Sequence, residues 1–239
     1  MSTLSITVDI EDWYHIPSVT GSPFAVCKDG NEFFDGWNGR YDYLTEPTKR
    51  VLDMLDEFDI KATFFVVADV VGHYQGLVES IVSVNSLYNK TDSSLKGVSS
   101  YPYYPKKNGL DLGVGEEKER DFIEFPWPYW NVFGFNFKIP TAGGPMLRFL
   151  GAHVILKGLK QSTKRGHTVF YFHPIDISEE KFPAVGKGRP LYWIVKGKLV
   201  EKRIRYILKN LKDVNKVCMK DASLGATIGR SVKEEGDKA

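Results

Sequence analysis

Four side chains that could do acid–base or metal chemistry follow two segments with the composition of buried strands. Asp9, Glu11 and Asp12 come directly after a short run rich in β-branched residues near the N-terminus. Carboxylates at this density raise one another's proton affinity or hold a divalent cation. His173 comes directly after a second such run, where a strand ends and an imidazole can project into a cleft. Since hydrolysis needs a base for water and an acid for the leaving amine, the two strand ends together favour a hydrolytic site over a solvated acidic turn and a structural histidine.

Such a site requires parallel strands that end at the same edge of a sheet. The run Leu4–Ile10 predicts one buried strand and Lys61–Val67 predicts a second. Between them, Pro47–Phe58 has apolar residues at helical spacing, with Thr45 as the expected N-cap. Strand, helix and strand in this order predict a right-handed βαβ crossover and therefore an α/β protein with a parallel sheet.

The rest of the chain predicts further strands and helices around one loop-rich segment. Residues Val82–Gly115 are rich in Asn, Ser, Tyr, Pro and Gly, which predicts mostly loop. We expect one domain over residues 1–224 and a polar C-terminal tail over residues 225–239. The elements expected after the loop are strands at Phe122–Pro126 and Phe135–Ile139, a helix at Pro145–Lys164, a strand at His167–His173 and a helix at Val200–Leu211.

Composition and charge argue against several classes of protein. Lys and Arg number 32 against 30 for Asp and Glu, so the net charge of +2 gives no footprint for nucleic acid. The two cysteines, Cys27 and Cys218, fit a reducing compartment and exclude a disulfide framework. The N-terminus has no signal-peptide pattern, and no stretch is as long as a membrane span. We therefore expect a cytoplasmic protein with no nucleic-acid partner and no membrane span.

Several segments occur in an order that is typical of one enzyme family. They are Val8-Asp9-Ile10-Glu11-Asp12-Trp13, Ala62-Thr63-Phe64-Phe65-Val66-Val67, Thr91-Asp92-Ser93-Ser94-Leu95, Gly143-Gly144-Pro145-Met146-Leu147-Arg148, Phe170-Tyr171-Phe172-His173-Pro174 and a basic helix at Lys202–Leu208. This set resembles the polysaccharide deacetylase family, whose enzymes share the NodB homology domain. The resemblance runs from about Leu4 to about Leu211 and is closest to the branch found in bacterial polysaccharide and O-antigen biosynthesis.

The resemblance implies a fold, a reaction and a set of roles. The implied fold is a distorted (β/α) barrel of the NodB type, here shortened. The implied reaction is hydrolysis of the N-acetyl group of a sugar by a metal-bound water, with acetate as a product, so the implied partner is an N-acetylated saccharide of a polysaccharide or its precursor. On this chain Asp9 matches the base, Glu11 or Asp12 matches the acidic metal ligand, and His173 matches the general acid. The implied cofactor is a divalent metal, zinc being the typical ion for such a water.

One landmark of the family is missing from this sequence. The family supplies two further metal ligands from a His-x-x-x-His motif, followed by Arg-x-x-Pro, and neither pattern occurs between Ile81 and Leu95. Zinc in proteins ordinarily has at least three protein ligands, so a rebuilt site would need His15 or His73. The alternative hypothesis is a non-catalytic carbohydrate-binding or scaffolding protein derived from this fold. Hydrolysis of a cyclic amide ranks after both, because no residue here selects it.

The expected substrate contacts are Trp13, Trp130 and Arg148. Arg148 could contact an acidic sugar or lie on a helix surface. The aromatic residues between positions 125 and 130 could line a saccharide groove or pack in the core. Gly143-Gly144 predicts a tight turn that brings backbone near the cleft, or a plain junction between loop and helix.

Overall fold

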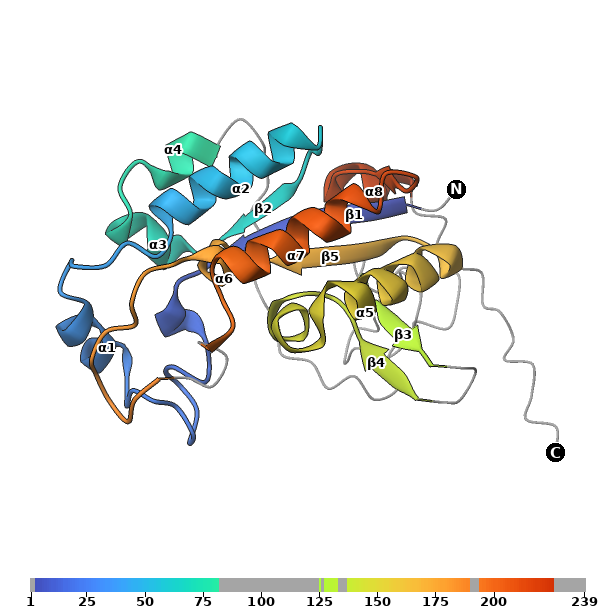
Figure 1. Cartoon of the computed structure of the whole chain (residues 1–239). Helices are drawn as coiled ribbons and strands as arrows, with labels where there is room; N and C mark the ends of the chain where they lie inside the picture. Colours follow the sequence, from blue (N-terminus) through green and yellow to red (C-terminus); the bar gives the residue numbers. More distant parts are fainter. Residues whose placement is uncertain (1–2, 82–124, 126, 133–136, 190–193, 226–239) are drawn as a thin grey trace, which may run out of the picture.

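A parallel β-sheet lies at the centre of the protein (Figure 1). The computed structural model describes residues 3–81, 125, 127–132, 137–189 and 194–225. β1 (Thr3–Ile10) lies between β2 (Thr63–Val66) and β5 (Thr168–Phe172), and β6 (Asn215–Lys216) pairs with the first residues of β1. All of these pairings are parallel, so the predicted βαβ order is confirmed.

The two faces of the sheet differ in chemistry because successive side chains of a strand point to opposite sides. The even-numbered residues of β1 are Leu, Ile, Val and Ile, and all four are fully buried in the main core. The odd-numbered positions Ser5, Thr7 and Asp9 are polar. The catalytic candidate Asp9 therefore lies on the polar face, at the carboxyl end of β1.

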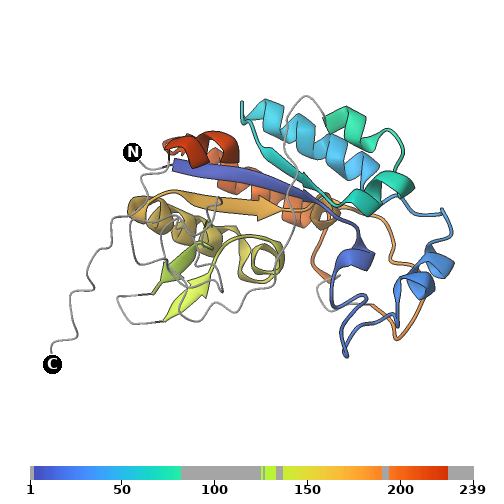
Figure 2. The same ribbon diagram turned by 180° about the vertical axis from the view of Figure 1, so that it is seen from behind.

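Three helices cover one side of the sheet, as a comparison of the two views shows (Figures 1 and 2). They are α2 (Thr45–Glu57), α5 (Gly144–Arg165) and α7 (Lys198–Lys209). Each adds apolar side chains to the core that contains the even-numbered residues of β1. Burial of these apolar faces provides the main driving force for folding. All three helices were predicted within a few residues of their observed ends.

The start of α2 corrects one detail of the sequence analysis. Thr45 is the first residue of the helix, and the N-cap position belongs to Leu44, whose side chain makes no capping hydrogen bond. The backbone N–H groups of Leu44 and Thr45 instead donate to a carboxylate oxygen of Asp42, at 3.1 and 2.7 Å. Asp42 thus supplies the hydrogen-bond acceptor that was expected from Thr45.

The remaining elements are short, and the described strands form an open parallel sheet and a separate antiparallel pair, β3 (Tyr129–Asn131) with β4 (Lys138–Pro140). The mixed α/β class is confirmed, and a closed barrel is not found among the described residues. The predicted strand at Phe135–Ile139 overlaps β4. The predicted loop at Val82–Gly115 and the tail after Gly225 lie outside the described residues. So does the predicted strand at Phe122–Pro126, except for Phe125. No helix in the described part of the chain is long and apolar enough to cross a membrane. The short elements that remain are η1 (Trp13–His15), α1 (Gly30–Trp37), α3 (Ala68–His73), α4 (Leu77–Ile81), β3 (Tyr129–Asn131), β4 (Lys138–Pro140), α6 (Pro174–Ile177) and α8 (Met219–Gly225).

Candidate active site

Three of the predicted site residues meet where β1 and β5 end. Val8 pairs with Phe172 in the parallel register, so the next residues of the two strands, Asp9 and His173, lie side by side. The Nε2 atom of His173 is 3.0 Å from Oε1 of Glu11 and 3.9 Å from Oδ2 of Asp9. The carboxyl ends of two neighbouring parallel strands thus bring these three side chains together.

The opposite edge of the His173 ring contacts a carboxylate that the sequence analysis did not single out. Oδ2 of Asp176 accepts the backbone N–H of His173 at 2.9 Å and lies 3.2 Å from its Nδ1 atom. His173 is the N-cap of α6, Pro174 follows at the first turn, and Asp176 occupies the N3 position of a capping box. The signal was present in the sequence, as an acidic residue three positions after the histidine and just past a proline.

A buried cation completes this row of charges. The Nε–H group of Arg148 donates to Oδ1 of Asp176 at 2.9 Å, and its Nη2 atom contacts the same oxygen. The two side chains are 3% and 1% exposed. The row Arg148, Asp176, His173 and Glu11 thus alternates in sign, which offsets the cost of removing each charge from water.

The electrostatics of the row keep His173 protonated near neutral pH. Burial lowers its pKa, but the charges and hydrogen bonds of Asp176 and Glu11 outweigh this effect and raise the pKa to about 10. Burial likewise raises the pKa of Asp176, whereas Arg148 and His173 together hold it well below its ordinary range. Both ring N–H groups of the imidazolium therefore donate to carboxylates. A fixed imidazolium beside a carboxylate can donate a proton to a leaving group.

Asp12, the other expected metal ligand, has a different environment. Its side chain is 1% exposed and accepts hydrogen bonds from the backbone N–H of Trp13 and the hydroxyl of Tyr74. It thereby caps η1. Burial raises its pKa to about 7, and the two hydrogen bonds partly counteract that effect. Both oxygens of Asp12 are thus engaged within the protein.

The three expected substrate contacts are not gathered on one surface. Trp13 is fully buried, and the Arg148 guanidinium lies 5.1 Å from the centre of its ring. Arg148 is therefore neither on a helix surface nor presented to solvent, because Asp176 and Trp13 enclose it. Trp130 is half-buried in β3, with the ammonium of Lys157 5.2 Å from its ring.

The described residues do not fit the zinc site that the family resemblance implies. Among them, no group of three or more His, Cys, Asp or Glu side chains is arranged to hold a metal ion. Nδ1 of His15 accepts the backbone N–H of Asp12 at 3.0 Å, and its Nε2 lies 3.5 Å from Asp69. The ring of His73 stacks on Phe34, with the centroids 4.5 Å apart. Neither histidine completes the Asp9, Glu11 and His173 cluster.

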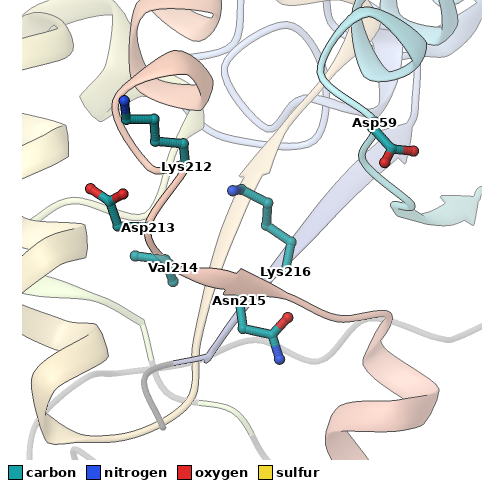
Figure 3. Close-up of a pocket in the computed structure, with 6 residues that line it drawn as sticks. All are labelled: Asp59, Lys212, Asp213, Val214, Asn215 and Lys216. Carbon is teal, nitrogen blue, oxygen red and sulfur yellow. The ribbon is translucent and has the colours of Figure 1, made fainter.

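A separate polar cavity of about 440 Å³ lies beside β6, at the other end of the sheet (Figure 3). Its lining includes the cations of Lys212 and Lys216 and the carboxylates of Asp59 and Asp213. These charges balance, so the cavity has no evident preference for an anionic or a cationic ligand. β6 pairs with the first residues of β1, whereas Asp9 lies near the end of that strand. The cavity is thus not part of the candidate active site.

Comparisons with known proteins identify the family and support the fold. Residues 94–216, more than half of the chain, match a domain of unknown function (DUF3473), and residues 33–105 match the polysaccharide deacetylase model. A crystal structure from Mycobacterium smegmatis, provisionally described as a polysaccharide deacetylase, superimposes with a TM-score of 0.51 over 98% of this chain and 94% of that chain, at 16% sequence identity. A search of the curated proteins gave no match. The chain therefore belongs to the family of this domain of unknown function, and its resemblance to polysaccharide deacetylases of the NodB type is confirmed.

Proposed function

We propose that the protein is a hydrolase that removes N-acetyl groups from the sugars of a polysaccharide or its precursor. The observation that carries the proposal is the cluster of Asp9, Glu11 and His173, in which the Nε2 atom of the imidazole faces both carboxylates at adjacent strand ends. The polysaccharide deacetylase match over residues 33–105 supports the substrate class. In this class an amide bond is exchanged for an amine and acetate.

The side chains of the cluster divide the proton transfers between them. The Asp9 carboxylate is 34% exposed, which allows it to take a proton from an incoming water. As the water oxygen bonds to the acetyl carbon and the C–N bond breaks, the Nε2–H of His173 supplies the proton for the leaving nitrogen. Glu11, 3.0 Å from this atom, fixes the orientation of the imidazole. One proton is taken up and one is released, so the site returns to its starting state once its protons redistribute.

Metal dependence is a separate part of the proposal. Polysaccharide deacetylases are generally metal-dependent, but the described residues supply no fitting ligand set. The proton transfers above are therefore assigned only to side chains of this chain. The poor fit favours a second candidate function, a carbohydrate-binding protein that has kept the fold and lost the reaction.

Acetate release from N-acetylated oligosaccharides, measured with and without added zinc or cobalt, separates the two functions. We expect release by the native chain and a loss of at least about 100-fold in Asp9→Asn, since a positioned base typically contributes about 10²–10⁴ in rate. Asp53→Asn, which removes an exposed carboxylate on α2, is the matched control and should keep the native rate. Chain that binds the oligosaccharide but releases no acetate under any metal condition would support the binding protein instead.

A further inference from the structure

An aromatic row extends from the catalytic cluster to the protein surface. The ring of Tyr171 makes an edge contact with His173, with the centroids 5.5 Å apart at 84°. It also contacts the ring of Trp127, with the centroids 5.7 Å apart at 47°. Trp127 is 44% exposed, so this row ends at an indole that solvent can reach.

Tyr171 of the aromatic row lies on the same face of the sheet as the catalytic carboxylate of Asp9. Tyr171 pairs with Thr7, which lies two residues before Asp9 in β1, so the three side chains share one face. His173 follows Tyr171 by two residues and has extended backbone, which places it on that face as well. Asp9, Tyr171 and His173 therefore share the polar face of the sheet.

The double glycine before α5 allows Tyr171 to lie where it does. Gly143 has φ of +155°, and a Cβ atom there would be 1.7 Å from the Tyr171 carbonyl oxygen. A Cβ on Gly144, whose φ is +49°, would be 3.0 Å from the Tyr171 hydroxyl oxygen. The two residues therefore let the backbone run directly against β5 and the ring of Tyr171. This close approach goes beyond a plain junction between loop and helix.

We infer that Trp127 and Tyr171 form a sugar-stacking subsite next to the reacting group, so that the substrate is an oligosaccharide of at least two rings. The inference rests on the proposed function, because one ring must present its acetamide to Asp9 and His173. A pyranose ring has an apolar C–H face that packs well on an aromatic surface, while the phenol and indole keep polar atoms for sugar hydroxyls. The neighbouring ring of the chain would lie on Trp127.

Binding of N-acetylglucosamine and N,N′-diacetylchitobiose, measured by calorimetry in the Asp9→Asn background to prevent turnover, tests the subsite. We expect the disaccharide to bind about tenfold more tightly, a gain of about 1.4 kcal/mol. Trp127→Ala should abolish this gain and leave the monosaccharide unaffected, whereas Trp127→Phe should keep most of it. Phe137→Ala is the matched control, since it removes a 65% exposed aromatic ring close in sequence to β4 and should leave the gain intact.

Several results would overturn the subsite. Equal affinity for the two saccharides, no binding of either, an equal loss for both in Trp127→Ala, or loss of the gain in Trp130→Ala but not in Trp127→Ala would each do so. Acetate release by chain with native Asp9 is scored separately. A gain that depends on Trp127 without any acetate release would refute the proposed function and keep the subsite, and acetate release without that gain would do the reverse.

Discussion

Replacing Asp176 with Asn removes the central charge of the buried row while keeping the shape of the side chain. Arg148 would then be a buried cation without its carboxylate, since its side chain is 3% exposed and Asp176 is 1% exposed. Breaking a buried pair in this way costs about 3–5 kcal/mol. A domain of this size loses roughly 2–4 °C in Tm for each kcal/mol, so thermal unfolding should show a fall of roughly 6–20 °C.

Two comparison variants separate charge from packing. The double variant Arg148→Met/Asp176→Asn should recover part of the loss, because the guanidinium that loses Asp176 is gone and an apolar side chain takes its place. Glu179→Gln breaks the exposed pair with Lys198, whose side chains are 51% and 75% exposed, and should cost at most about 1 kcal/mol. Urea unfolding of the four chains gives the free energies directly.

A second readout concerns the site itself. In Asp176→Asn the pKa of His173 should fall, because burial continues to lower it while the carboxylate that raises it most is lost. Following the imidazole protons of His173 by NMR across a pH titration would measure this. A loss of stability below 1 kcal/mol together with an unchanged His173 pKa would refute the idea that the charge row holds the site.

Three further predictions concern pH and two close contacts. Between pH 6.5 and about 10 the free energy of unfolding should fall by up to about 1.4 kcal/mol per pH unit, because the folded chain keeps a proton on His173 that the unfolded chain has released. Urea titrations should show a shallower fall with pH in His173→Gln than in the native chain. An identical fall in both chains would contradict this prediction. Gly158→Ala should cost about 1–3 kcal/mol, since its Cβ would lie 2.1 Å from Oγ1 of Thr141, whereas Gly72→Ala, with nothing within 4 Å, should not lower Tm. Within α5 the backbone leaves the helical conformation at Gly151, where φ is +76° and ψ is +171°, which produces a kink. Arg203→Met removes two guanidinium hydrogen bonds to the carbonyls of Leu147 and Arg148, just before this kink, so hydrogen exchange in the first half of the helix should become faster. Unchanged protection would show that the kink does not need these bonds.

Local pattern predicted the sheet and its reactive edge for a physical reason. Short runs rich in β-branched residues favour strands, and a strand, a helix and a strand in this order favour a parallel pair. Parallel strands end at one edge, so Asp9 and His173 were expected at that edge. The pairing of β1 with β5, which the sequence did not predict, makes them neighbours. The approach of Glu11 to the same imidazole extends this logic by two residues past the strand.

The partners of these residues depended on contacts between distant parts of the chain. Arg148 precedes Asp176 by 28 positions, and only the packing of α5 against the site shows that the arginine is buried and paired. Trp13 was expected to contact the substrate because it is an aromatic residue beside the acidic segment. Its ring is fully buried because of the residues that pack around it. The spacing of apolar residues along the sequence does not tell which distant element a side chain such as Arg148 or Trp13 will contact.

The three carboxylates at the end of β1 show what the sequence determines and what only the tertiary structure decides. Its sequence determined that three carboxylates would follow a buried strand, because alternation and strand length are local properties. The tertiary structure decided that Glu11 contacts His173, that Asp12 caps η1 and accepts from Tyr74, and that Asp9 keeps an exposed carboxylate. Environments set by burial and by residues from other elements separate identical functional groups into different roles.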